Sequence, residues 1–167
     1  MKTRGIILFI ALSLGLSAQT VTVSNTNDAG LGSLRQAIVD ANSNWGIDNM
    51  VFNIPTSDPN YNAATGVFTI KITSTELPSI NNRVLLIDGF TQTAFTGNTN
   101  TTSFGAGGQV GIDNIALPTV DGPEIEIIDD SPNNNLKWGI QIGGEDITVR
   151  GLAIHSFGND WFLFDNA

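Results

Sequence analysis

The chain has 167 residues, enough for one domain, a formal net charge of −9 and no cysteine. Without cysteine it can form no disulfide and no thiolate metal site, so burial and hydrogen bonds must stabilise it. Its 7 Lys and Arg residues are scattered. Nucleic acids and anionic lipid surfaces both attract clustered positive charge, so we expect neither as a partner.

The N-terminus has the plan of a secretory signal peptide. Lys2 and Arg4 precede an apolar run over residues 5–16, and small residues follow, ending at Ala18. A membrane span needs roughly 20 apolar residues, so the run is short for a retained anchor helix, which is the alternative. We expect a signal peptide over residues 1–18. Its removal takes away two positive charges and changes the net charge from −9 to −11. The mature chain is then expected outside the cell or at the cell surface, associated with the outer membrane and inserted in no membrane.

Residues 33–42 are predicted to form the one convincing helix of the mature chain. Ser33, with Gln36 three residues later, is a capping box, in which the hydroxyl accepts a helix amide and the glutamine reaches back. The residues at helical spacing that form one apolar stripe are Leu34, Ala37, Ile38 and Ala41. A helix this short is marginal alone, so the stripe must pack on something. We expect residues 19–55 to be an N-terminal cap of strand, helix and strand, with Ser33, Leu34, Gln36 and Ile38 as its structural residues.

Short strands and turns fill residues 56–167, where we expect a polar loop excursion at about 91–109. The segments that start at Ile125 and Ile147 resemble each other and begin 22 residues apart. Short strands that return every twenty-odd residues are typical of a parallel β-solenoid. A sandwich or barrel is the alternative, but the consecutive apolar positions and the absence of two-residue hairpins favour the solenoid. The sequence therefore predicts an all-β fold, a right-handed parallel β-helix capped by the helix at about 33–42.

Much of the mature chain also resembles a known group of proteins. The block formed by residues 21–28, 32–38 and 50–55 resembles the N-terminal capping region of secreted bacterial right-handed parallel β-helix proteins. These proteins belong to the pectate-lyase-like superfamily and often carry a related cysteine-containing cap, the CSLREA domain. The segments that resemble their first coils are residues 77–80, 86–89 and 147–154.

The resemblance implies export and fold, but no single activity, because its members include adhesins, surface stalks and polysaccharide-active enzymes. This chain lacks the cysteine pair of the CSLREA pattern, so packing alone is expected to hold its cap. Members are usually much longer, so the resemblance implies a fragment truncated at its C-terminus.

Two basic residues were weighed as catalytic groups. His155 is the only histidine, and with no cysteine or second histidine to complete a metal site or a triad it is expected in a turn or on the surface. Lyases of the resembled fold use a basic residue to abstract a proton, which makes Arg150 a candidate base. We instead expect Arg150 to pair with Glu124, Glu126 or Asp146, and we expect no catalytic site in this segment.

Acidic residues gather between positions 124 and 146. Carboxylates stacked on neighbouring strands can bind Ca²⁺ through oxygen, but neither an EF-hand loop nor a calcium-binding nonapeptide occurs here. Solvated acids are the default interpretation, and no other cofactor is expected. The weak calcium candidates are Asp129, Asp130, Glu145 and Asp146.

The leading functional prediction is an exported surface or secreted module with a structural or adhesive role, whose partners are carbohydrate or other surface proteins. The alternative is the N-terminal part of a carbohydrate-active enzyme, a polysaccharide lyase or glycoside hydrolase whose catalytic coils lie beyond residue 167. A third possibility is a calcium-stabilised binding module. The sequence alone identifies neither ligand nor substrate.

Overall fold

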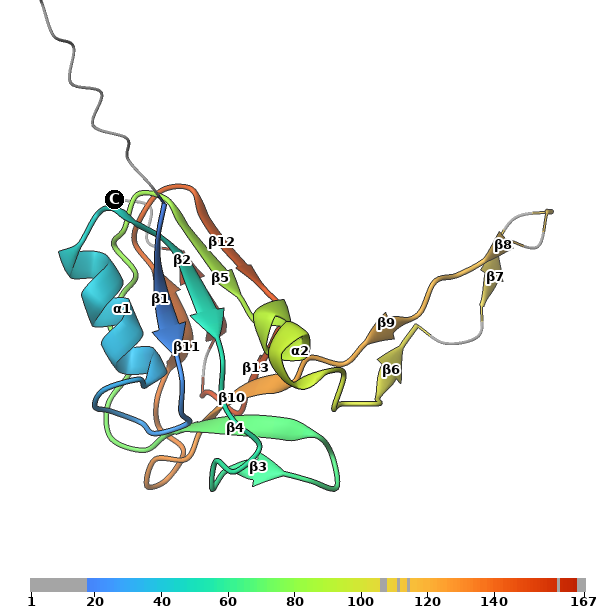
Figure 1. Ribbon diagram of the computed structural model, residues 1–167, viewed down its shortest axis with the longest axis horizontal. Helices are drawn as coiled ribbons and strands as arrows, with labels where there is room; N and C mark the ends of the chain where they lie inside the picture. The colour runs from blue at the N-terminus through green and yellow to red at the C-terminus, as the bar shows by residue number, and fades with distance from the viewer. Residues whose placement is uncertain (1–17, 106–107, 111, 114, 159, 165–167) are drawn as a thin grey trace, which may run out of the picture.

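The computed structural model describes residues 18–105, 108–110, 112–113, 115–158 and 160–164, so the predicted signal peptide lies outside the described residues except for Ala18. The described residues form two helices and fourteen short strands (Figure 1). Neither helix is long and apolar enough to cross a membrane. The helices are α1 (Leu34–Ser43) and α2 (Phe90–Thr96). The strands are β1 (Gln19–Val23), β2 (Ile47–Phe52), β3 (Tyr61–Asn62), β4 (Val67–Ile72), β5 (Leu85–Asp88), β6 (Ser103–Phe104), β7 (Gln109–Val110), β8 (Ile115–Ala116), β9 (Val120–Asp121), β10 (Ile125–Asp129), β11 (Trp138–Ile142), β12 (Ile147–Arg150), β13 (Leu152–His155) and β14 (Asp160–Phe164).

Most strands pair in parallel with partners that are distant in the sequence. Sheet A has the order β1-β2-β5-β12 and is parallel throughout. Sheet B has the order β13-β10-β4-β3, parallel except for its β3–β4 pair. A third sheet consists of the parallel pair β11–β14. Two antiparallel pairs, β6–β9 and β7–β8, lie in a segment that leaves the sheets between β5 and β10.

The predicted all-β, right-handed parallel β-helix with a single helix is wrong. The chain has a second helix, its strands lie in five separate sheets, and three of those sheets contain antiparallel pairs. The described residues form no closed solenoid. The physical reason lies between β5 and β10, where α2 and a long projecting segment take the chain out of the sheets and form antiparallel pairs of their own. The fold is mixed α/β.

The 22-residue interval is not the repeat of this fold. Ile125 lies opposite Phe68 and Leu152 in sheet B, whereas Ile147 lies opposite Leu85 in sheet A. The two similar segments therefore belong to different sheets. Their likeness reflects a shared alternation of side chains, which any half-buried strand requires.

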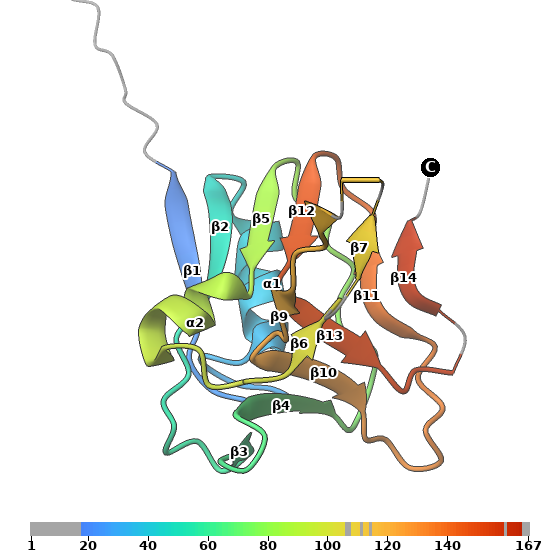
Figure 2. The ribbon, with the colours of Figure 1, turned by 90° about the vertical axis from the view of Figure 1, so that its right-hand side faces the viewer.

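Helix α1 begins and ends within one residue of the predicted helix. Its N-cap is Ser33, whose hydroxyl accepts the amide of Gln36 at 3.2 Å. The apolar stripe is buried in the core, and α1 lies behind the strands of sheet A in the view of Figure 2. At the other end, the buried side chain of Asn82 donates to the carbonyls of Ala41 and Ile47. These bonds fix the C-terminal end of α1 against the start of β2.

The core lies between the sheets and α1. Inward-facing side chains of β4, β5 and β10, such as Ile70, Ile87 and Ile127, are fully buried. Each such side chain contributes roughly 1.5–3 kcal/mol relative to exposure. Burial of this alternating row stabilises the ladders.

Helix α2 occupies residues where the sequence predicted the start of a loop. It has no apolar stripe, and its buried residue is Gln92, which is 0 % exposed. The Gln92 amide accepts from the backbone nitrogen of Ile54 and donates to the carbonyl of the same residue. The hydroxyl of Thr91 accepts the amide of Phe52. The end of β2 has no paired residue on β5, and side chains of α2 make the backbone hydrogen bonds there instead.

Candidate functional site

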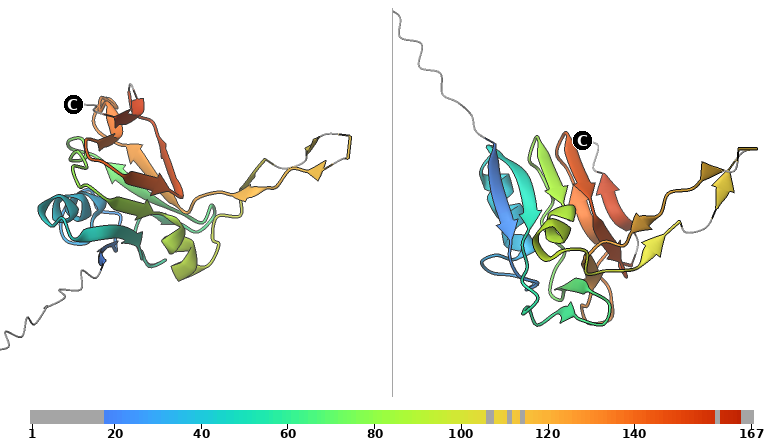
Figure 3. Two further views of the ribbon diagram at one scale, coloured as in Figure 1. Left: turned by 90° about the horizontal axis from the view of Figure 1, so that it is seen from above. Right: turned by 45° about the vertical axis from the view of Figure 1, so that its right-hand side comes forward.

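The most prominent feature outside the core is a projecting arm, residues 97–123, which extends well away from the rest of the molecule, hereafter the body (Figures 1 and 3). It replaces the polar excursion expected at about 91–109, starting after α2 and continuing to the start of β10. Its two antiparallel ladders contain two residue pairs each. Isolated two-stranded ribbons are marginally stable in water, so the arm depends on its base for its position.

Hydrogen bonds between the two chain segments hold the base of the arm together, and a bond from Thr99 joins it to the body. Asn98 donates to Asp121 at 2.9 Å, and the side chain of Asn100 donates to the carbonyl of Pro123 at 2.9 Å. Thr99 donates to the carbonyl of Gly66 at 2.6 Å. Gly66 has φ +73°, and a Cβ atom there would lie 1.8 Å from the Thr99 carbonyl oxygen. The close approach of the two backbones therefore requires glycine at this position.

The arm exposes apolar side chains that the body does not cover. Ile112 near the tip is 99 % exposed, and the side chains that share this property are Phe104, Ile115, Leu117 and Val120. Single exposed apolar residues are ordinary on protein surfaces, whereas contiguous apolar patches are typical of interaction surfaces. The arm contains no Lys or Arg.

A pocket of about 300 Å³ lies where the arm meets α2, hereafter the base pocket. Phe90 and Thr93 of α2 line one part of it, residues 119–122 of the arm another, and Glu124 completes it. Glu124 is 2 % exposed. Its Oε2 accepts a hydrogen bond from the Thr93 hydroxyl. Two carboxylates, those of Asp121 and Glu124, thus line one small pocket without a basic residue among the lining side chains.

Only one oxygen of the Glu124 carboxylate has a hydrogen-bond donor among the described residues. Oε2 accepts from Thr93, and no described residue donates to Oε1. Within that same set every fully buried side-chain oxygen has a partner, so Oε1 is not fully enclosed. Glu124 is among the residues that line the base pocket. Neither Glu124 nor Asp121 forms an ion pair with a basic side chain within the described part of the chain.

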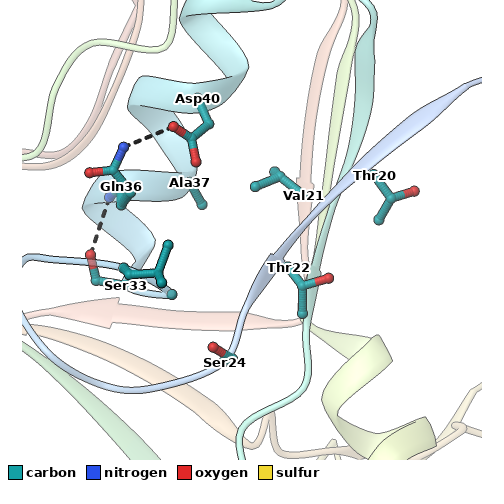
Figure 4. Close-up of a pocket in the computed structure, with 10 residues that line it drawn as sticks. Thr20, Val21, Thr22, Ser24, Ser33, Gln36, Ala37 and Asp40 are labelled. Atoms are coloured by element: carbon teal, nitrogen blue, oxygen red, sulfur yellow. Dashed lines mark hydrogen bonds between the residues drawn. The ribbon is translucent and has the colours of Figure 1, made fainter.

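A second hollow, of about 320 Å³, lies between the outer edge of β1 and α1 (Figure 4). Its polar side chains bond to one another, because Gln36 donates to Asp40 at 2.8 Å and its backbone amide donates to Ser33. Gln36 does not reach back to Ser33, so only half of the predicted capping box forms. The remaining lining residues are Thr20, Val21, Thr22, Ser24, Leu31, Gly32 and Ala37.

The four weak calcium candidates are not gathered into one site. Asp129 is buried and accepts the backbone amides of Ser131 and Leu136, which closes the turn after β10. Asp130 pairs with Lys71 at 3.4 Å, and the exposed Glu145 lies 3.8 Å from Arg83. Asp146 has φ +52° at the turn before β12. No group of three or more His, Cys, Asp or Glu among the described residues could hold a metal ion.

His155 is exposed at the end of β13. Its Nε2 contacts Glu126 at 2.7 Å and its Nδ1 contacts the hydroxyl of Ser156 at 2.8 Å. This chain of groups could not be predicted from the sequence, because Glu126 lies on the neighbouring strand β10. The three groups line neither of the two pockets described above. In this open position the arrangement provides an ion pair when the imidazole is protonated, rather than a water-excluding catalytic site.

Arg150 pairs with Asp88, at 2.6 Å, rather than with Glu124, Glu126 or Asp146 as expected. The hydrogen bond and the charge of Asp88 raise the pKa of Arg150 above its ordinary value. The guanidinium carbon also lies 5.9 Å from the centre of the Phe90 ring, beside the base pocket. Arg150 is therefore held as a cation, which does not suit it to proton abstraction.

Comparisons with protein-family models, with curated proteins and with solved structures found no match for this chain. The resemblance to pectate-lyase-like proteins thus rests on the sequence segments alone. The arm and the base pocket are the features of the molecule that bear on its function.

Proposed function

We propose that this chain is an exported cell-surface or secreted module with a structural or adhesive role, and that the arm makes the adhesive contact. The observation that carries the proposal is the row of exposed apolar side chains on a segment that projects from the body. Export is proposed because the N-terminus has two basic residues, then an apolar run, then small residues suited to a signal-peptide cleavage site.

The position of the arm supports a role in contact. The apolar core lies in the body, and the exposed side chains of Ile112 and Ile115 do not belong to it. Keeping apolar side chains in water has a cost of roughly 25 cal/mol per Å² relative to burial, which a bound partner would remove. The proposed partners are surface proteins or carbohydrate.

The test compares the chain with an arm-trimmed variant, in which Asn-Gly replaces residues 106–118. Phe104 and Val120 are paired across the ribbon. Gly105 follows Phe104 and Thr119 precedes Val120, so a two-residue turn between Gly105 and Thr119 can close the shortened ribbon. Fluorescent beads coated with each protein are incubated with cells of the source organism. We expect retention of the trimmed variant to fall at least about fivefold, as loss of about 1 kcal/mol of contact requires. Equal retention contradicts the proposal.

Pretreatment of the cells identifies the class of partner. Protease should abolish retention if the arm contacts a surface protein, whereas periodate should abolish it if the arm contacts carbohydrate. Mass spectrometry of the exported protein tests the other half of the proposal, because cleavage after Ala18 leaves Gln19 as the first residue. A retained residue 1–18 segment would contradict export by this route.

A carbohydrate-active enzyme is the second candidate, favoured by the two carboxylates of the base pocket. Glycoside hydrolysis uses a pair of carboxylic side chains on either side of the bond that is cleaved. The assay is release of reducing ends from polysaccharides, comparing the chain with Glu124→Gln. Release that disappears in Glu124→Gln supports the enzyme and contradicts a purely adhesive role.

A further inference from the structure

We propose that the base pocket binds a primary ammonium group, presented as the side chain of a lysine in a partner protein. The ammonium site follows from the pocket itself. The source of the lysine rests on the proposed adhesive function, since the pocket lies at the base of the arm.

The negative charge of the base pocket favours a cationic ligand. Glu124 is 2 % exposed, and among the described residues its carboxylate accepts one hydrogen bond, from the neutral hydroxyl of Thr93. A buried carboxylate without a cation costs several kcal/mol, because protein atoms replace its hydration. Asp121 adds a second negative charge to the lining. A ligand that brings positive charge to Oε1 of Glu124 would offset this cost, whereas a neutral ligand would deepen the desolvation.

The oxygen atoms available at the base pocket favour an ammonium group over other cations. A calcium ion takes six to eight oxygen ligands, and no cluster of three potential metal-binding side chains occurs in the described part of the chain. A guanidinium group is bound best by both oxygens of one carboxylate, and the Thr93 hydroxyl already takes one of the acceptor positions of Oε2 of Glu124. An ammonium group is a compact charge with three donors and can bond to Oε1 alone.

Phe90 adds an aromatic ring to the base pocket. Its ring is about half exposed and lines the base pocket, so it offers an aromatic surface to a bound cation. Arg150 already lies 5.9 Å from the ring centre. The Asp88 carboxylate, 2.6 Å from Arg150, neutralises that charge. The unbalanced charge at the pocket is therefore that of the two lining carboxylates, and it favours a cation.

Size and position point to a lysine side chain. A volume of about 300 Å³ is at the lower end of the range for ligand pockets, which suits a four-carbon amine better than an oligosaccharide. A protein that covers the apolar side chains of the arm would place its surface next to the base pocket. The flexible stem of lysine can then reach in from that surface.

The site is tested by calorimetric titration of the mature chain with butylammonium chloride, with Nα-acetyl-lysine N-methylamide, and with butanol as the neutral counterpart. Both amines should bind saturably and compete with each other, and butanol should bind at least tenfold more weakly. Glu124→Gln should weaken amine binding at least tenfold. The matched control is Glu126→Gln, a half-buried carboxylate on sheet B, and should leave binding unchanged.

Three results would overturn the ammonium site: equal binding of butanol and butylammonium, unchanged amine binding in Glu124→Gln, or saturable Ca²⁺ binding that Glu124→Gln abolishes. Circular dichroism and urea unfolding of Glu124→Gln verify that the variant is folded. If Glu124→Gln fails to fold, Thr93→Val provides the second variant, because it removes the donor to Glu124 and should change amine affinity severalfold. Unchanged affinity in Thr93→Val then overturns the proposal.

Bead retention separates this inference from the proposed function. Loss of retention in both the arm-trimmed variant and Glu124→Gln supports an adhesive contact that includes a lysine. Loss in the trimmed variant alone overturns the lysine contact and leaves the adhesive role standing. Amine binding without any retention loss on trimming overturns the adhesive role and leaves the ammonium site.

Discussion

The body and the arm use the same kinds of residue in opposite ways. In the body, alternating apolar side chains of parallel strands face a common interior, and Ile127 is 0 % exposed. In the arm, two-residue strands present similar side chains to water, and Ile112 is 99 % exposed. The difference teaches that apolar composition alone does not define a core. A side chain stabilises the fold only where neighbouring ladders cover it, and elsewhere it is available for binding.

The largest expected effect is that of shortening a core isoleucine in the body. Ile127→Ala should lower the free energy of unfolding by about 4 kcal/mol, because it removes buried methylene groups and leaves a cavity. The matched change in the arm, Ile112→Ala, should alter it by less than about 0.5 kcal/mol. Urea unfolding followed by far-UV circular dichroism measures both. Similar losses in the two variants would remove the distinction between body and arm.

The buried side chain of Gln92 attaches α2, which precedes the arm, to the backbone of Ile54 in the body. Gln92→Leu keeps the volume but leaves the amide and carbonyl of Ile54 without their side-chain partners. We expect a loss of about 3 kcal/mol, since an unsatisfied buried group costs roughly 1–3 kcal/mol. Gln141→Leu, at a half-buried outward position of β11, is the control and should change little. A stable Gln92→Leu protein would show that α2 is not needed to complete sheet A.

Asp28 provides a pH-dependent contact within the body. Burial raises the pKa of Asp28, but hydrogen bonds from Arg35, Ser74 and Thr73 outweigh burial, so its pKa lies below the ordinary value of 3.8. The stabilisation is therefore complete above the ordinary pKa and is lost as the pH falls through the lower folded value.

Thermal unfolding between pH 2 and 6 measures this contribution. Asp28→Asn should lower stability by about 1–2 kcal/mol at pH 6, and the difference from the original chain should shrink as the pH falls below about 4. Asp113→Asn in the arm, where the side chain is exposed, should follow the original chain at every pH. A constant deficit for Asp28→Asn across this range would contradict the assigned cause.

Local features of the fold could be predicted from the sequence, because their signals are contained in a few neighbouring residues. The N-cap at Ser33 and the stripe that includes Leu34 and Ile38 placed α1 within one residue. Strand β4 carries a similarly local signal, because its buried side chains, Phe68, Ile70 and Ile72, alternate with half-buried ones.

Pairing between distant strands could not be predicted in the same way. The sequence analysis compared Ile125 with Ile147, but the partner of Ile147 is Leu85, on the far side of the arm. The arm separates neighbouring strands by different numbers of residues, so no constant interval marks the ladders. Helix α2 left no apolar stripe to recognise, since its buried residue is a glutamine.

The base pocket was missed for a related reason. Phe90 and Glu124 lie on opposite sides of the arm in the sequence, and only the hydrogen-bonded base brings them to one place. One signal was present, because Glu124 is a charged residue next to the inward-facing start of a strand. The burial of Glu124 indicates a binding site only together with its hydrogen bond from Thr93 and its place in the base pocket.

The unfolding free energy of the arm-trimmed variant tests most directly whether the arm is separate from the folding of the body. Urea unfolding should give a value within about 1 kcal/mol of that of the original chain, because no described residue between 106 and 118 belongs to the core. A loss of more than about 3 kcal/mol would show that the arm is part of the folded core, and would contradict its assignment as a surface kept for binding.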